Sequence, residues 1–147
     1  MTDSTTAKKT LQSVRILDIR IDAKIAEIAQ LKDMVTKVTP TLTGVTIPSG
    51  NSDKIGDAVS RIVDLQNEIN ADIDAYVDAK RSVSGILDRI TDADQLQVLN
   101  KRYIQYKQWE TIATDMNMTL RNVHYIHGSA LKTVSEIMND MKGNNND

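Results

Sequence analysis

Apolar residues recur at steps of three and four through most of the first 90 positions, which predicts two long helices. The first helix spans about residues 7–38 and contains neither Gly nor Pro. Its length at 1.5 Å per residue is about 48 Å. The charged residues between its apolar positions carry both signs, as expected for a solvated face. The apolar positions are Leu11, Val14, Leu17, Ile21, Ile25, Ile28, Leu31, Val35 and Val38.

The second helix, residues 53–90, carries a heptad repeat without a gap. Its first positions are Ile55, Ile62, Ile69, Tyr76, Val83 and Ile90. Additional apolar residues follow three or four positions later: Val59, Leu65, Ile73, Ala79, Ile86 and Leu87. This pattern is typical of a coiled coil. The apolar band is wider than one partner helix would cover, which favours self-association or the docking of another protein.

Residues 39–52 interrupt the periodicity and separate the two helices. Because the helices are similar in length and the segment reverses the chain, we expect an antiparallel helical hairpin. The segment is either a plain crossover or a partner-binding loop anchored by Val45 and Ile47. It contains Pro40, Gly44, Pro48 and Gly50.

Shorter elements follow position 90. Thr91 and Asp94 have the spacing of a capping box and predict the start of a third helix that reaches about Lys107. The apolar face of that helix would comprise Leu96, Leu99 and Tyr103, and Tyr106 and Trp109 are also expected to be core residues.

Residues 109–134 predict a helix, a tight turn and a second helix. Asn117 tolerates the left-handed conformation found at helix ends, and Thr119 can cap the next helix through its hydroxyl. The second helix would bury Val123, Ile126, Ala130 and Val134 and expose Leu120, Arg121, His124, Tyr125 and Gly128. In a helix-turn-helix, this exposed side enters the DNA major groove.

Charge and composition exclude some classes of protein. The chain has a formal net charge of −2 and no Cys, so it is neither a bulk basic nucleic-acid coat nor a disulfide-stapled domain. Between residues 101 and 132, five cationic side chains against Glu110 and Asp115 leave a local net charge of +3. The polar N-terminus and the absence of a long apolar run predict a cytoplasmic protein without a membrane anchor.

The segment RYIQYKQWETIATDMNMTLRNVHYIHGSALKTV resembles the region 4 helix-turn-helix of sigma-70-type transcription factors. The matching positions are Ile112, Ala113, Met118, Thr119, Val123, Ile126, Ala130, Leu131 and Val134, with Asn117 where that family usually has Gly. The whole chain is similar to RinA- and ArpU-type late-gene activators, which are phage- and prophage-encoded regulators of low-GC Gram-positive bacteria. Segments such as IVDLQNEINADID resemble a subgroup of unknown function.

This resemblance implies double-stranded DNA as partner, RNA polymerase as a further contact, and control of phage late genes in the bacterial host. By position, Leu120 would contact a thymine methyl group and Arg121 can pair with guanine in bidentate fashion. His124 and Tyr125 would contact either a base edge or a phosphate. The candidates for phosphate contacts are Lys107, Gln108, Thr119, Asn122, Ser129 and Lys132, and Gly128 lies on the same exposed side.

The prediction is therefore an all-α chain that forms a homo-oligomer through its hairpin. Residues 1–90 would form the coiled-coil hairpin, residues 91–142 the helix-turn-helix domain, and residues 143–147 a disordered tail. The alternatives are a DNA-recognition subunit of a packaging machine, like a small terminase subunit, and a protein-binding adaptor that does not bind DNA. His124 and His127 lack the companions of a metal site, and no motif indicates an enzyme or a cofactor.

Overall fold

The computed structural model describes residues 3–38 and 49–145, and within them the protein is helical without any strand. The elements are α1 (Ser4–Val38), α2 (Ser49–Leu87), α3 (Ala93–Leu99), the π-helical turn η2 (Asn100–Ile104), α4 (Trp109–Asp115) and α5 (Leu120–Asn144). The predicted all-α class and the two long helices are confirmed. Val45 and Ile47, proposed as a loop anchor, lie outside the described residues, as do residues 146–147 of the predicted tail. None of the described helices is long and apolar enough to cross a membrane.

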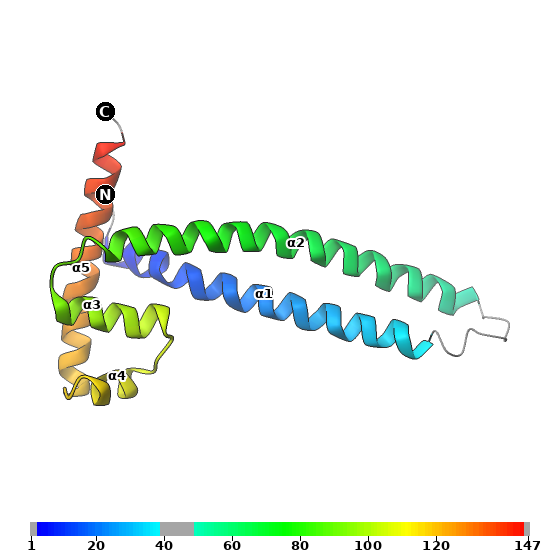
Figure 1. Cartoon of the computed structure of the whole chain (residues 1–147), viewed down its shortest axis with the longest axis horizontal. Coiled ribbons are helices and arrows are strands. Elements are labelled where there is room, and N and C mark those ends of the chain that lie inside the picture. The colour runs from blue at the N-terminus through cyan, green and yellow to red at the C-terminus, as the bar shows by residue number, and fades with distance from the viewer. Residues whose placement is uncertain (1–2, 39–48, 146–147) are drawn as a thin grey trace. The chain divides into compact units, whose positions relative to one another are not determined.

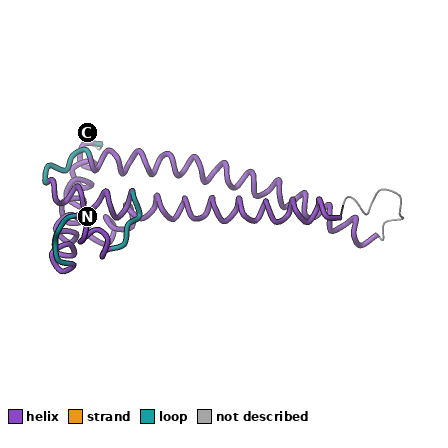
Figure 2. The backbone as a smooth tube through the Cα atoms, turned by 60° about the horizontal axis from the view of Figure 1, so that its bottom comes forward, coloured by secondary structure: helices purple, strands orange, loops and turns teal. Residues whose placement is uncertain are grey.

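The chain divides into two compact units, of which the first, Leu17–Ala75, is called the two-helix unit. In it α1 and α2 lie side by side and run in opposite directions (Figures 1 and 2). Two ion pairs join the helices: Lys24 Nζ lies 2.6 Å from Asp72 Oδ2, and Arg61 Nε lies 3.2 Å from Glu27 Oε1. Because these groups are partly exposed, they contribute little stability. Ile21 of α1 and Leu65 of α2 are the buried apolar side chains of this unit among the described residues.

Several positions expected in the coiled-coil core are exposed in this unit. Ile25 is 51% exposed, Val59 47% and Ile73 42%. A contact between two helices buries one narrow seam on each. These residues lie beside the seam, so a single partner helix does not cover them. The apolar band is therefore wider than the contact, as the sequence predicts.

The second compact unit, Met1–Ile16 with Tyr76–Asp147, is called the α5 unit. Its larger core cluster joins the first turns of α1, the end of α2, the α3–η2 segment and the middle of α5. A smaller cluster joins α3, α4 and the start of α5. The larger cluster consists of Ala7, Leu11, Val14, Val83, Ile86, Ile90, Leu99, Tyr103, Ala130, Leu131 and Val134. The smaller consists of Val98, Ile112, Ala113 and Val123.

The segment before α4 differs in detail from its prediction. Asp92, rather than Thr91, caps α3, because its Oδ1 accepts a hydrogen bond of 3.0 Å from the backbone N–H of Gln95. The α-helix ends at Leu99 and continues as the π-helical turn η2. Tyr106 then adopts a left-handed conformation with φ 59°, so the predicted single helix stops before Lys107. Tyr103 is buried as expected, whereas Leu96 is 36% exposed.

We expect the first turns of α1 to contribute to the stability of the α5 unit as much as its other helices do. Leu11 is 1% exposed, whereas Ile16, on the same helix and in the same unit, is 47% exposed. Leu11→Ala should lower the free energy of unfolding by about 2–5 kcal/mol because it leaves a cavity. Ile16→Ala should change it by less than about 0.5 kcal/mol. Urea denaturation measures both, and equal losses would contradict this packing.

Candidate nucleic-acid interface

The turn between α4 and α5 has the geometry that the sequence predicts. Asn117 is left-handed with φ 54°. The N–H of Met118 donates to the carbonyl of Ala113 at 2.9 Å, and the N–H of Asn117 donates to that of Thr114 at 3.2 Å. This pair of hydrogen bonds is a Schellman motif, in which Asn supplies the left-handed residue that is more often Gly.

Thr119 caps α5 directly after this turn. Its Oγ1 accepts a hydrogen bond of 3.1 Å from the backbone N–H of Asn122. Replacement of such a cap by Ala typically costs about 1 kcal/mol. The turn and the cap together fix where α5 begins and which of its faces is buried.

The buried and exposed faces of α5 follow the predicted spacing. Val123, Ala130 and Val134 are fully buried, whereas Ile126, also expected to be buried, is half-buried against the smaller cluster. The residues expected to fall away from the core are all exposed: Leu120, Arg121, His124, Tyr125 and Gly128. Tyr125 is the extreme case, with 74% of its surface accessible. The start of α5 therefore presents an arginine, a histidine and a tyrosine to the outside on one helix.

Five of the predicted site residues line one pocket of about 510 Å³: His124, Tyr125, Gly128, Ser129 and Lys132. The remaining wall is Ser4, at the first position of α1. The start of α1 therefore lies beside the exposed surface of α5 and borders its second half. The sequence gives no signal for this neighbour, because Ser4 is more than a hundred positions away along the chain.

The cations around α4 are largely engaged within the protein. Lys107 Nζ lies 2.6 Å from Asp115 Oδ2, and Lys101 Nζ lies 3.7 Å from the same oxygen. The hydrogen bond from Lys107 and the charges of both lysines hold the pKa of Asp115 below its usual value. Arg102 donates to the carbonyl of Lys107 at 3.0 Å and stacks over the ring of Trp109. Pairing with Asp115 neutralises part of the charge that Lys107 could offer to a phosphate.

The other predicted contacts are exposed or partly so. Gln108 is the N-cap residue of α4 and makes no side-chain capping bond. Asn122 and Lys132 are exposed, and Ser129 is half-buried. Within residues 119–132, Arg121 and Lys132 are thus the two exposed cations of α5, and the local excess of positive charge expected from the sequence falls mainly on them.

A cluster of aromatic side chains packs on the buried face of α5. The Tyr103 hydroxyl and His127 Nε2 form a hydrogen bond of 2.7 Å, and the ring centroid of Trp109 lies 4.6 Å from that of His127. Burial, together with the smaller effect of the charges of Lys8, His124 and Arg102, lowers the pKa of His127 to about 4. Burial also raises the pKa of Tyr103 to about 12. Trp109 is half-buried and packs against the smaller cluster, as expected for a core anchor.

His127 is the residue that the sequence analysis missed. It is 8% exposed, whereas His124, three positions earlier on the same helix, is exposed. The spacing of Val123, His127, Ala130 and Val134 is 4, 3 and 4, which places His127 on the buried face. Among the described residues, no group of three or more His, Cys, Asp or Glu side chains is placed to hold a metal ion.

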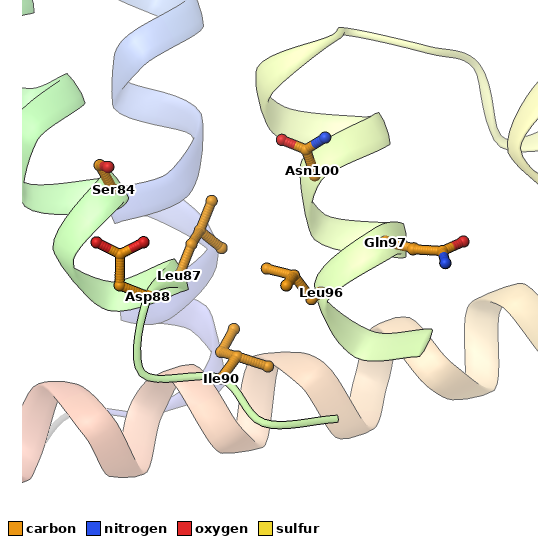
Figure 3. A pocket seen from close by; sticks show the side chains of 7 residues that line it. All are labelled: Ser84, Leu87, Asp88, Ile90, Leu96, Gln97 and Asn100. Carbon is orange, nitrogen blue, oxygen red and sulfur yellow. The ribbon is translucent and has the colours of Figure 1, made fainter. Parts of the chain in front are cut away.

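A second pocket, of about 560 Å³, lies between the end of α2 and α3 (Figure 3). The side chains of Leu87, Ile90 and Leu96 face a shared space. Polar groups of Ser84, Asp88 and Asn100 also line the pocket. No sequence motif indicates this pocket, because its apolar residues come from the end of one periodic pattern and the start of another.

Comparison with known proteins adds no relative: no family model matches the chain, and no curated protein or solved structure matches it significantly.

We expect the buried histidine to make stability depend on pH. The pKa of His127 is about 4 in the fold and near 6.5 when the chain is unfolded, so only the unfolded state gains its proton between these values. Stability from this group is present above pH 6.5 and is lost as the pH falls toward 4. As the pH falls through this window, the equilibrium constant for unfolding should rise by up to about tenfold per pH unit.

The measurement is urea denaturation at a series of pH values. His127→Gln should remove this part of the slope, even if it also lowers stability at pH 7. His124→Gln, at an exposed position, removes only the smaller effect of the His124 charge on His127 and should therefore keep most of the slope of the parent protein. An unchanged slope in His127→Gln would show that this group is not buried in its neutral form.

Proposed function

We propose that the protein is a sequence-specific DNA-binding regulator of transcription, in which α4 and α5 act as a helix-turn-helix and the exposed side of α5 enters the major groove. In this proposal α1 and α2 form an antiparallel coiled-coil hairpin that joins copies of the chain. The resemblance to sigma-70 region 4 and to phage late-gene activators supports transcription as the process, with RNA polymerase as a further partner.

The observation that carries the proposal is the exposed first half of α5. The Asn117 turn and the Thr119 cap orient this helix, and its opposite face is fixed by two core clusters. A recognition helix needs this combination, because its side chains must reach base edges from a rigid base. Leu120 and Arg121 are exposed, and Tyr125 is exposed beside the start of α1; the exposed fractions are 40% for Leu120 and 74% for Tyr125.

These side chains can make the hydrogen bonds and apolar contacts that base edges in the major groove offer. Arg121 can donate two hydrogen bonds to the O6 and N7 atoms of guanine, and Leu120 can contact a thymine methyl group. The N-terminal end of α5 carries the positive end of the helix dipole, which favours a nearby phosphate. Lys132 lies three turns further along the same helix and is exposed, so it can contact the DNA backbone.

The first experiment is a selection of bound fragments from sheared DNA, with and without bacterial RNA polymerase. A recurring site should emerge, and its binding should weaken as salt is raised because phosphate contacts release counterions. Enrichment only in the presence of polymerase would support a sigma-like co-activator. A folded protein that enriches no sequence under either condition would contradict the proposal and favour a protein-binding adaptor.

On the selected site, Arg121→Ala should weaken binding roughly 5- to 150-fold, the equivalent of about 1–3 kcal/mol. The matched control is Arg89→Ala, since Arg89 is also exposed but lies after α2 and outside the α4–α5 segment. Fluorescence anisotropy with the selected duplex measures both. Equal losses for the two variants would show that the effect is one of general charge and that Arg121 reads no base.

Gly128→Ala separates binding from stability. A Cβ atom at Gly128 would meet nothing within 4 Å, and Ala favours a helix over Gly by up to about 1 kcal/mol. The substitution should therefore raise Tm while it weakens DNA binding, because Gly128 lies on the side that faces the groove. Gly85→Ala, which also has free space, should raise Tm without changing DNA binding. If Gly128→Ala left the affinity for DNA unchanged, Gly128 would not be part of the DNA interface.

A further inference from the structure

One side of α2 carries an exposed stripe of residues. The order of apolar and polar residues along this stripe is the same when it is read from either end of the helix. Its members are Val59, Val63, Gln66, Asn70, Ile73 and Val77. The four apolar members are 42–48% exposed, and Gln66 and Asn70 are exposed as well. The steps between successive members are 4, 3, 4, 3 and 4, so all six lie along one side of the continuous helix α2 (Ser49–Leu87). We call this set the α2 stripe.

The order of residue types in the α2 stripe is apolar, apolar, polar, polar, apolar, apolar. Its midpoint is position 68. When a second copy of α2 is laid antiparallel with the two midpoints together, Val63 of one copy faces Ile73 of the other. Gln66 then faces Asn70, and Val59 faces Val77. This is the self-complementarity that a two-fold interface requires, because each contact then occurs twice.

The charges beside the stripe match the antiparallel direction. Asp53 and Arg81 occupy the same heptad position, four heptads apart on the outer flank of the stripe. In the antiparallel pairing, the outer flanks of the two copies lie on the same side of the interface, and Asp53 of each copy lies within about 3 Å, along the axis, of the level of Arg81 of the other. In a parallel pairing about a two-fold axis, the two outer flanks lie on opposite sides of the interface, so Asp53 of one copy cannot pair with Arg81 of the other. Charge therefore selects the same direction as the pattern of apolar residues.

We propose that the α2 stripe is the dimer interface of the protein, and that it takes a second copy of the same chain packed antiparallel about a two-fold axis near position 68. Apolar contact at both ends supplies affinity. Gln66 and Asn70 at the centre fix the register, since an amide pair is satisfied only by the matching amides. The C-terminal ends of the two α2 helices then lie about 57 Å apart along the axis.

Cysteine cross-linking tests the direction without background, since the chain has no Cys. The probes are Val63→Cys and Ile73→Cys in the full chain, mixed and oxidised. The mixed sample should yield a cross-linked heterodimer, because the two positions face each other. Each variant alone should cross-link at least several-fold less, because its own position in the partner is about 15 Å away along the axis. Stronger cross-linking of either variant to itself would overturn the antiparallel arrangement.

Sedimentation equilibrium tests whether the stripe holds the dimer at all. Ile73→Asp should weaken dimerisation at least tenfold. Ile19→Asp is the matched control, since Ile19 is also in the two-helix unit and is 56% exposed but lies on α1. A monomeric parent protein at 100 μM, or equal effects of the two variants, would overturn the proposal. This inference does not rest on DNA binding, because both readouts are made without DNA.

Discussion

The burial of one face of α5 is the constraint on which the α5 unit depends. Val123 near the start of the helix belongs to the smaller cluster, whereas Ala130, Leu131 and Val134 belong to the larger one. A single helix therefore joins the packing of α3 and α4 to that of the ends of α1 and α2. Because the buried face is fixed at both clusters, the helix cannot rotate, and the opposite side keeps one set of residues exposed.

Polar interactions refine this arrangement. The Tyr103–His127 pair satisfies two polar groups inside an apolar region, where an unpaired group would be costly. Asp115 holds Lys101 and Lys107 near the turn, and Arg102 covers Trp109. These contacts draw three cations toward the protein and leave Arg121 and Lys132 on the outer surface. The electrostatic character of the candidate interface is thus set by a few pairings and only in part by the local count of charges.

Local signals in the sequence were sufficient for the helices, the Asn117 turn and the Thr119 cap, because each depends on residues within a few positions. They were insufficient for contacts between distant segments. No periodicity shows that Leu11 belongs to the same core cluster as Val134, or that Ser4 borders the pocket beside Tyr125. Heptad spacing placed Val59 and Ile73 in a core, but spacing alone does not reveal how many partner helices are present. His127 was within reach of the spacing argument, yet its polar side chain suggested a surface.

The most direct test of the account is to map which amides respond when the ¹⁵N-labelled protein is titrated with duplex DNA. The account predicts that the largest chemical-shift changes fall between residues 119 and 132, on the exposed side of α5, and that buried positions such as Val134 change less. Changes confined to the two-helix unit, with α5 unaffected, would contradict it, because the exposed side of α5 would then have no part in DNA binding.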